Sequence, residues 1–373
     1  MIVTLITFVL ILGLLVFIHE LGHFIVAKRC GLTVEEFGLG FPPRLFKYKH
    51  GETVYSLNLL PFGGFVKILG EDGEGSDNPK SFASQSAGRR ALILLAGVIM
   101  NFLLGTLLFI IVYLIGAPAA IDSTTVGTIT NRQIQIAAVA NDSPAAVAGL
   151  REFDQIKSVA GTEITAVEQV QQIMATNAGQ ATQVVIHRAN EDLTVTLTPR
   201  VNPPQGEGPL GVDLVESGIV RYPWYNAIWR GVVTSFSLLF LVVVEIGKIF
   251  RDFFTTGHVD GNAVSGPIGI AVFTGQVARL GFSYLLQFVA FLSIQLAFLN
   301  VVPFPALDGG RLLFVIIEKF RGGKKVAQKV EGIIHFVGFA LLLALIVAVS
   351  FRDIYHFRAQ FIDLWHRIVN VFR

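Results

Sequence analysis

The strongest constraint on the fold is an apolar run at the start of the chain, which is too long for an ordinary buried helix. Residues 2–27 are apolar with five polar exceptions: Thr4, Thr7, His19, Glu20 and His23. Because about 20 apolar residues span the core of a bilayer as a helix, the run predicts a transmembrane segment. A secretory signal peptide is the alternative, but no positive segment precedes the run and no small-residue cleavage site follows it.

Composition extends this prediction to the whole chain. Of its 373 residues, 53% are hydrophobic and only 15% are charged, whereas soluble domains carry about 25% charged residues. We therefore expect a polytopic α-helical membrane protein in contact with the lipid bilayer. A net charge of +2 and the lack of a basic patch with interleaved aromatics argue against nucleic-acid binding. The single cysteine, Cys30, rules out an internal disulfide.

Three later apolar runs, together with the first, predict about four transmembrane helices. They cover residues 91–115, about 285–302 and about 333–349. Residues 227–250 are also apolar enough to enter lipid, but Glu245 and Lys248 interrupt them near their end. We expect this segment to be a membrane-embedded or surface helix, because a crossing there would invert the span that follows it.

Two regions show β-strand patterns. In "ETVYSLNLLPFGGFVKILG", apolar and polar residues alternate up to Pro61, and Gly63 and Gly64 then turn the chain into a second apolar run. This predicts a β-hairpin at the membrane surface, followed by the acidic loop "EDGEGSDNPK". Residues 118–208 have the composition of a soluble α/β module, with four strand-like stretches and a predicted helix at 166–177.

Part of this module, "NDSPAAVAGLREFDQIKSVAGTEI", resembles the middle of a bacterial PDZ domain. A length of about 85 residues fits one such domain, and an unspecified small β-rich domain is the alternative. We therefore expect four parts: an N-terminal membrane half at 1–117, the PDZ-like module at 118–208, a membrane-associated helix with linkers at 209–280, and a C-terminal membrane half at 281–373.

The stretch "VFIHELGHFIVAKRC" places ionisable groups inside the first apolar run. His19 and His23 are four residues apart, so on a helix they lie on one face. This is the H-E-x-x-H pattern, in which two imidazoles bind zinc and the glutamate, here Glu20, acts as general base. The alternative is a pair of structural histidines packed against a neighbouring helix. That alternative must explain three polar groups at membrane depth, where each is costly.

A catalytic zinc ion needs a third protein ligand and an open position for water. None of the six other histidines has a second polar feature around it. In "NVVPFPALDGGRLLF", by contrast, Pro303 and Pro305 interrupt an apolar helix, which is tolerated at membrane depth only where the backbone lines a cavity. Asp308 follows directly, and Gly309 and Gly310 allow another backbone to come close. Asp308 is therefore the candidate third ligand for one zinc ion.

The two motifs together, "HELGH" and "NVVPFPALDGG", resemble the site-2 proteases, which are intramembrane zinc metalloproteases. "EFGLGFPPRLF", "LLPFGGFVKILGED", "AGRRALILLAGVIMNFLLG" and "VSGPIGIA" are similar to segments of the bacterial branch typified by the regulator of sigma-E protease. That branch has four spans and periplasmic PDZ insertion after the second, and this chain has one PDZ-like module where some relatives have two. The resemblance implies zinc ligands His19, His23 and Asp308, catalytic acid/base Glu20, and Asn300 near the scissile carbonyl or in helix packing.

The predicted hairpin suggests how a substrate is bound. A transmembrane substrate must be unwound before cleavage, and its free backbone groups then need new partners in the membrane. Strand addition to the hairpin would supply them, which makes Tyr55, Leu57 and Asn58 candidate substrate-binding residues. The family resemblance implies that substrates are single-span proteins, such as anti-sigma factors or remnant signal peptides, already trimmed by an upstream site-1-type protease.

Charge bias predicts the topology. Lysines and arginines crowd the first loop and the segment after the third span, so the positive-inside rule makes both cytoplasmic. The PDZ-like module then lies outside the cytoplasm, and the metal half-sites lie towards the cytoplasmic side of a bacterial inner membrane. The basic, aromatic tail "FRDIYHFRAQFIDLWHRIVNVFR" falls outside against this bias, and we interpret it as an interfacial amphipathic helix.

Two other functions use parts of the same pattern. One is a catalytically silent membrane adaptor that binds partners through its PDZ-like module, and the other is a metal transporter or sensor. Neither needs a carboxylate between the two histidines, so Glu20 favours the protease. Transporters with broken helices usually have paired halves, and no internal repeat is seen here.

Overall fold

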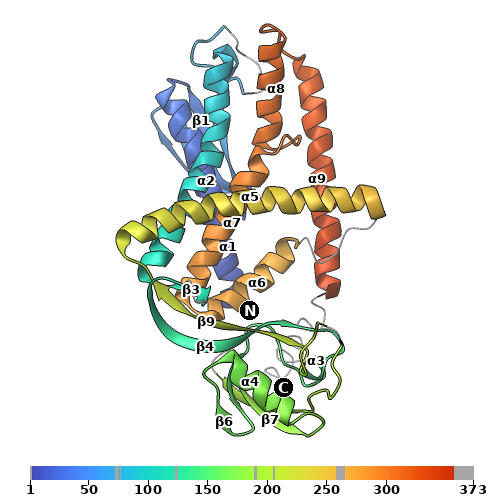
Figure 1. The fold of residues 1–373 in the computed structure, drawn as a ribbon. Coiled ribbons are helices and arrows are strands. Elements are labelled where there is room, and N and C mark those ends of the chain that lie inside the picture. Colours follow the sequence, from blue (N-terminus) through green and yellow to red (C-terminus); the bar gives the residue numbers. More distant parts are fainter. Residues whose placement is uncertain are drawn as a thin grey trace, which may run out of the picture. The chain divides into compact units, whose positions relative to one another are not determined.

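The computed structural model describes residues 2–71, 75, 77–121, 125–188, 191–204, 206–257 and 265–356 (Figure 1). The chain forms two compact units. Unit 1 contains residues 1–109, 231–278 and 285–373, and unit 2 contains residues 110–230 and 279–284. The basic, aromatic tail begins at Phe351: residues 351–356 belong to the helix Gln328–His356, and residues 357–373, for which an interfacial helix is expected, lie outside the described residues.

Five helices of the described chain are long and apolar enough to cross a membrane. They are α1 (Ile2–Arg29), α2 (Ala87–Ile115), α5 (Trp224–Thr256), α7 (Phe282–Val301) and α9 (Gln328–His356). Four of them match the expected spans. Their large apolar side chains remain exposed, as with Phe336, Leu343 and Leu345 on α9, which are 72%, 51% and 60% exposed. Such a surface is stable in lipid rather than in water, so the chain is a membrane protein.

The fifth helix, α5, covers the segment in which Glu245 and Lys248 interrupt the apolar run. Within unit 1 it contacts α2, where Thr106 Oγ1 donates to Ser235 Oγ at 3.0 Å and the rings of Phe102 and Phe236 lie 5.0 Å apart. In Figure 1 the axis of α5 runs across those of α2 and α9 rather than alongside them. By length and composition α5 could cross a membrane, so the expectation that it does not cross stays a prediction.

The helix break around Pro303 and Pro305 occurs as predicted. Helix α7 ends at Val301, a short turn follows, and α8 (Asp308–Phe320) begins at the predicted ligand. A Cβ atom at Gly309 would lie 2.5 Å from the carbonyl carbon of Val301, so only glycine fits there. The prolines therefore end one helix, and the glycine lets the next one start against the same turn.

The β-sheet of unit 1 differs from the predicted hairpin. Its strands are β1 (Val34–His50) and β2 (Thr53–Ile68), and the tight turn lies between them at residues 51–52 rather than at Pro61–Gly64. Both strands bend, so that four segments lie side by side in the order 64–68, 34–39, 54–57 and 46–50. The two runs that resembled a hairpin are separated by residues 34–39, because "EFGLGFPPRLF" is itself a strand.

This sheet packs against α1. The buried core between them contains Ala27, Leu32, Val34, Val66 and Ile68. Helix α2 also lies against α1, since a Cβ atom at Gly22 would be 2.8 Å from the carbonyl carbon of Ala96. The predicted zinc-binding face of α1 is therefore enclosed by α2 and the sheet. A further helix of unit 1, α6 (Pro267–Leu280), contacts the start of α1 through Gly275 and Thr4.

Unit 2 contains the predicted soluble module. Its sheet has the strand order β3-β9-β4-β5-β7-β8, with β6 paired to β5. The strands are β3 (Ala117–Ala120), β4 (Thr128–Val139), β5 (Gln155–Val159), β6 (Thr162–Glu163), β7 (Thr182–Arg188), β8 (Glu191–Leu197) and β9 (Val212–Arg221), and the helices are α3 (Pro144–Val147) and α4 (Val167–Thr176). Ile134, Ile156 and Val184 are among its fully buried core residues. Strand β9 continues the sheet beyond the expected boundary at residue 208.

Candidate metal centre

The two histidines of α1 point their Nε2 atoms towards each other. His19 and His23 are each 8% exposed, and their Nε2 atoms lie 3.3 Å apart. The Nδ1 atom of His23 lies 2.8 Å from the carbonyl oxygen of Ile93. Since a carbonyl oxygen only accepts, Nδ1 carries the hydrogen and donates it, which leaves Nε2 with a free lone pair for a metal.

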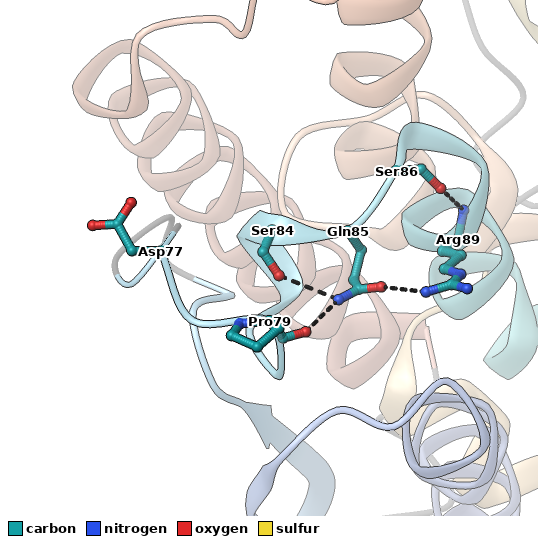
Figure 2. A pocket seen from close by; sticks show the side chains of 6 residues that line it. All are labelled: Asp77, Pro79, Ser84, Gln85, Ser86 and Arg89. Carbon is teal, nitrogen blue, oxygen red and sulfur yellow. Dashed lines mark hydrogen bonds between the residues drawn. The ribbon is translucent and has the colours of Figure 1, made fainter.

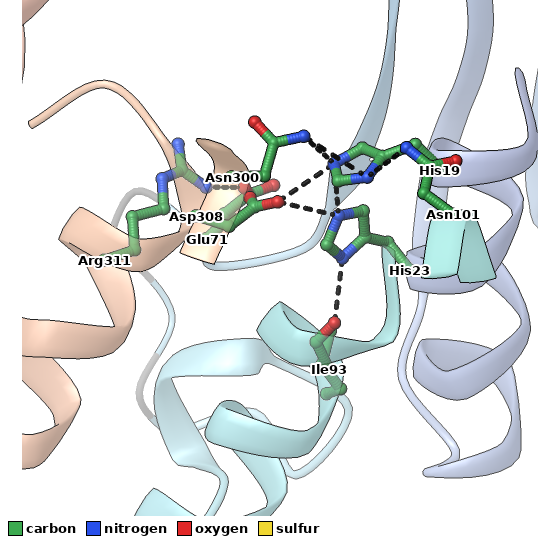
Figure 3. A network of polar contacts seen from close by, with 8 residues as sticks. All are labelled: His19, His23, Glu71, Ile93, Asn101, Asn300, Asp308 and Arg311. Carbon is green, nitrogen blue, oxygen red and sulfur yellow. Dashed lines mark hydrogen bonds and ion pairs between the residues drawn. The ribbon is translucent and has the colours of Figure 1, made fainter. Parts of the chain in front are cut away.

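The third predicted ligand meets these two atoms. Asp308 Oδ2 lies 2.9 Å from His19 Nε2 and 3.3 Å from His23 Nε2, as Figure 3 shows. Zinc binds such atoms at about 2.0–2.1 Å in tetrahedral geometry, which separates neighbouring ligand atoms by about 3.3 Å. The three atoms therefore fit a zinc ion, and two imidazoles with one carboxylate are a donor set typical of catalytic zinc. Among the described residues, His19, His23 and Asp308 form a cluster whose ligand atoms all lie within 4.8 Å of one another, close enough to hold one metal ion.

Glu20 lies beside this centre, between α1 and the sheet. A Cβ atom at Gly64 would be 3.1 Å from Glu20 Cγ, so the side chain of Glu20 contacts the backbone of the 64–68 segment. It is close enough for its charge to interact with those of His19, His23 and Asp308. Glu20 therefore lies beside the metal ligands and against the face of the sheet at Gly64.

Asn300 is near the centre, as the family resemblance implied. It lies in the last turn of α7, and its Nδ2 atom is 3.5 Å from both ring nitrogens of His19. The amide nitrogen thus lies next to the imidazole of one of the predicted zinc ligands. Its role towards the scissile carbonyl stays a prediction.

Two residues of α2 complete the centre, and the sequence analysis missed both. A Cβ atom at Gly97 would lie 2.7 and 2.8 Å from Cε1 and Nδ1 of His19 and closer still to Nε2 of His23. Asn101, one turn later, is fully buried, and its side-chain amide lies 3.5 Å from Nδ1 of His19. The sequence did contain a signal for them: within an apolar span, a polar residue follows a glycine by four positions, which places both on one face of the helix.

The amide of Asn101 can fix the tautomer of His19. Its Oδ1 atom has no hydrogen-bond partner within the described chain. A rotation of the amide by about 180° about its Cβ–Cγ bond places Oδ1 next to Nδ1 of His19. Nδ1 of His19 would then donate to Asn101, and Nε2 would be left to bind the metal. The hydrogen bond from His23 to the carbonyl oxygen of Ile93 has the same effect on His23.

The predicted substrate-binding residues lie inside the sheet rather than at its edge. Tyr55 is paired with Phe37 on one side and with Tyr48 on the other. Leu57 is likewise paired on both sides, and Asn58 Nδ2 donates to the carbonyl oxygen of Gly40 at 3.0 Å. The expectation that this stretch offers a free edge is wrong, because residues 34–39 occupy the position next to it. Within the described chain, no strand pairs with the outer side of residues 64–68, and Glu20 packs against the face of this segment at Gly64.

A separate hollow of about 570 Å³ lies at the start of α2 (Figure 2). The Gln85 amide nitrogen there donates to the carbonyl oxygen of Pro79 and to Ser84 Oγ, and Arg89 donates to Gln85 Oε1. These bonds connect the preceding loop to the helix. None of the predicted site residues lines this hollow.

Comparisons with known proteins agree with this geometry. Residues 7–345 match the model of Peptidase family M50. The zinc metalloprotease RasP of Geobacillus kaustophilus is 32% identical, with 95% of this chain and 98% of that protein covered. The protein of the same name from Oceanobacillus iheyensis is 31% identical over 94% and 98%. The regulator of sigma-W protease RasP of Bacillus subtilis is 29% identical over 94% and 98%.

A likeness to a solved structure covers part of the chain. The PDZ domain of an SdrC-like protein from Listeria monocytogenes covers 23% of this chain and 92% of that domain, with 16% identity and a TM-score of 0.21.

The enclosed ligand set with an adjacent glutamate defines a metallopeptidase centre on a membrane-spanning helix. Family and relatives agree with that class. The chain belongs to Peptidase family M50, the site-2 proteases, and resembles its RasP-like branch.

Proposed function

We propose that this protein is a zinc-dependent endopeptidase that cleaves transmembrane segments of single-span membrane proteins within the bilayer. One observation carries the proposal. The ligand atoms of His19, His23 and Asp308 lie at spacings suited to zinc, and Glu20 lies beside them and packs against Gly64 in the edge segment of the sheet. A metal carrier has no use for that glutamate or for that edge.

The residues of the chain divide the chemistry among them. A zinc ion bound here supplies a water molecule acidic enough to act as a nucleophile near neutral pH. Glu20 accepts a proton from the attacking water and later donates it to the leaving amine. Asn300 Nδ2 provides a donor for the oxygen of the reacting carbonyl. Ile93 and Asn101 hold the two imidazoles in the orientation that the ligands require.

The substrate is proposed to bind by strand addition to residues 64–68. An unwound substrate segment needs backbone partners in the membrane, and this edge supports main-chain pairing with little side-chain selectivity. Glu20 packs against the face of this segment at Gly64, so we place a strand paired here next to the residue that carries the catalytic carboxylate. Tyr55 and Asn58 then act by holding the interior of the sheet rather than by touching the substrate. The side chain of Leu57 is 46% exposed.

Substrates of this kind include anti-sigma factors and remnant signal peptides already trimmed by a site-1-type protease. The name of the Bacillus subtilis relative, regulator of sigma-W protease, supports this class. We propose that the soluble module is a PDZ domain outside the cytoplasm and that the zinc lies towards the cytoplasmic side of the bacterial inner membrane. A folded module of about 85 residues has a radius of gyration near 12 Å, so it would exclude substrates that keep a bulky external domain.

The test separates metal binding from catalysis. Glu20→Gln should retain zinc and lose cleavage of a single-span reporter, because no ligand changes. Asp308→Ala should lose both zinc and cleavage. Elemental analysis and cleavage assays of the purified full-length variants measure this. Full zinc retention by Asp308→Ala would remove that residue from the ligand set, and cleavage by Glu20→Gln would refute the mechanism.

A further inference from the structure

The free edge of the sheet ends at a carboxylate. Glu71 lies three residues after the end of β2, and its backbone N–H donates to the carbonyl oxygen of Ile68 at 3.1 Å. Its side-chain Oε2 in turn accepts from the backbone N–H of Ile68 at 3.3 Å. Glu71 therefore occupies the backbone groups of Ile68 that an added strand would otherwise use.

The direction of neighbouring backbone groups follows from alternation along a strand. The N–H of Leu69 donates to Thr33, on the side of the sheet interior. The N–H of Ile68 points the other way, towards Glu71. Because successive residues of an antiparallel strand direct their hydrogen bonds to opposite sides, the N–H groups of Val66 and Gly64 also face outward. The outward-facing N–H groups of this segment are thus those of Gly64 and Val66, with Glu71 at its end.

An arginine next to the metal centre holds this carboxylate. Arg311 donates to Glu71 Oε1 through Nη1 (Figure 3). Arg311 lies three residues after Asp308 on α8, so the two side chains lie on the same face of the helix, one turn apart. The arginine is also close enough to Glu20 for their charges to interact. One guanidinium therefore connects the end of the strand edge with the helix that carries a zinc ligand.

We propose that Glu71, held by Arg311, sets the register in which a substrate strand pairs with the edge and thereby selects the peptide bond that is cut. This inference rests on the proposed strand addition. With Glu71 in place, an added strand pairs with Gly64 and Val66 and cannot advance to Ile68. Removal of the side chain frees the N–H of Ile68 for an added strand, although the carbonyl oxygen of Ile68 still accepts from the backbone of residue 71. The strand can then slide by two residues, because a shift of two keeps every side chain on its original face.

Cross-linking measures the register of the substrate strand without any cleavage. The host is the full-length chain with Cys30→Ser and Glu20→Gln, so that the only cysteine is introduced and the substrate stays intact. Lys67→Cys places a thiol on the edge, since the side chain of Lys67 is 59% exposed. The probe is a single-span reporter with one cysteine moved along its cleavage region. We expect one reporter position to cross-link best. In Glu71→Ala the best position should shift by two residues, or a second position two residues away should also cross-link.

Cleavage gives the second readout in chains that retain Glu20. Mass spectrometry of the products should show one main cut with the native residues and an added cut two residues away for Glu71→Ala. Arg311→Gln should give the same added product, and the double variant should match the single ones, because the two residues act as one unit. The control is a second ion pair made by α8, the helix of Arg311. In this pair Arg90 of α2 lies 2.6 Å from Glu318 of α8. Arg90→Gln should lower thermal stability and leave the cut in place.

The outcomes separate the two proposals. Unchanged cross-link and cleavage positions in Glu71→Ala would overturn the role of Glu71. The same added product in Arg90→Gln would also overturn it, since general loosening would then be sufficient. Absence of cross-links at every reporter position would refute strand addition itself and the register with it. Cross-links without cleavage by the native chain would refute the proteolytic function, while the two-residue shift would still decide the role of Glu71.

Discussion

Gly97→Ala places a single methyl group in the metal centre. Gly97 lies in the interior of α2, where replacing glycine by alanine normally stabilises a helix by about 1 kcal/mol. Here the new carbon would lie 2.7 and 2.8 Å from the ring atoms Cε1 and Nδ1 of His19, and closer to Nε2 of His23. The favourable helix propensity is therefore opposed by a steric clash with two zinc ligands.

The size of the effect follows from these distances. Non-bonded heavy atoms settle at about 3.5 Å or more, so the imidazole of His19 must move by about 0.7 Å or more. Zinc ligand distances tolerate about 0.2 Å. Changes to residues that only orient a ligand cost about 10–100-fold in metal affinity, so displacement of the ligands themselves should cost at least about 100-fold.

The assay is a zinc titration of the purified full-length protein against a competing chelator, with elemental analysis of the isolated protein. Gly88→Ala is the matched control, because it lies in the same helix and a Cβ atom there meets no described atom within 4 Å. The control should keep zinc and cleavage and unfold at the same or a higher temperature. Native zinc affinity and cleavage in Gly97→Ala would refute the close approach of α2 to the ligands.

Three further predictions address the remaining parts of the site. Asn101→Leu should weaken zinc binding by about 10–100-fold, whereas Asn101→Asp, which keeps an acceptor for His19, should bind zinc more tightly than Asn101→Leu; equal affinities in the chelator titration would contradict the tautomer argument. Proline at Leu57 or at Lys67 removes a ladder donor from the sheet, so reporter cleavage should fall while zinc content holds, and unchanged cleavage in both variants would argue against substrate pairing on this sheet. Replacing residues 119–202 by a short Gly/Ser linker should leave trimmed reporters cleaved and also admit untrimmed ones; loss of cleavage of trimmed reporters at native protein level and zinc content would show recruitment instead of exclusion.

The sequence by itself determined the chemistry of the centre. His19, Glu20 and His23 are arranged by the period of a single helix, and that helix is specified by its apolar length. Asp308 was found because prolines in an apolar run leave backbone groups unpaired, which requires an unusual environment. These signals are local, so they can be read without knowing which elements touch.

The tertiary structure decided what surrounds the centre. Gly97 and Asn101 belong to the site only because α2 crosses α1 at that point, and apolar spans of similar composition could cross anywhere along their length. In the sheet, too, the sequence does not specify which segments are neighbours. Residues 53–60 and 63–68 look like two arms of one hairpin, yet residues 34–39 pair between them. Strand pairing depends on backbone hydrogen bonds between distant segments, and an alternating pattern specifies a face of the sheet but not the neighbour.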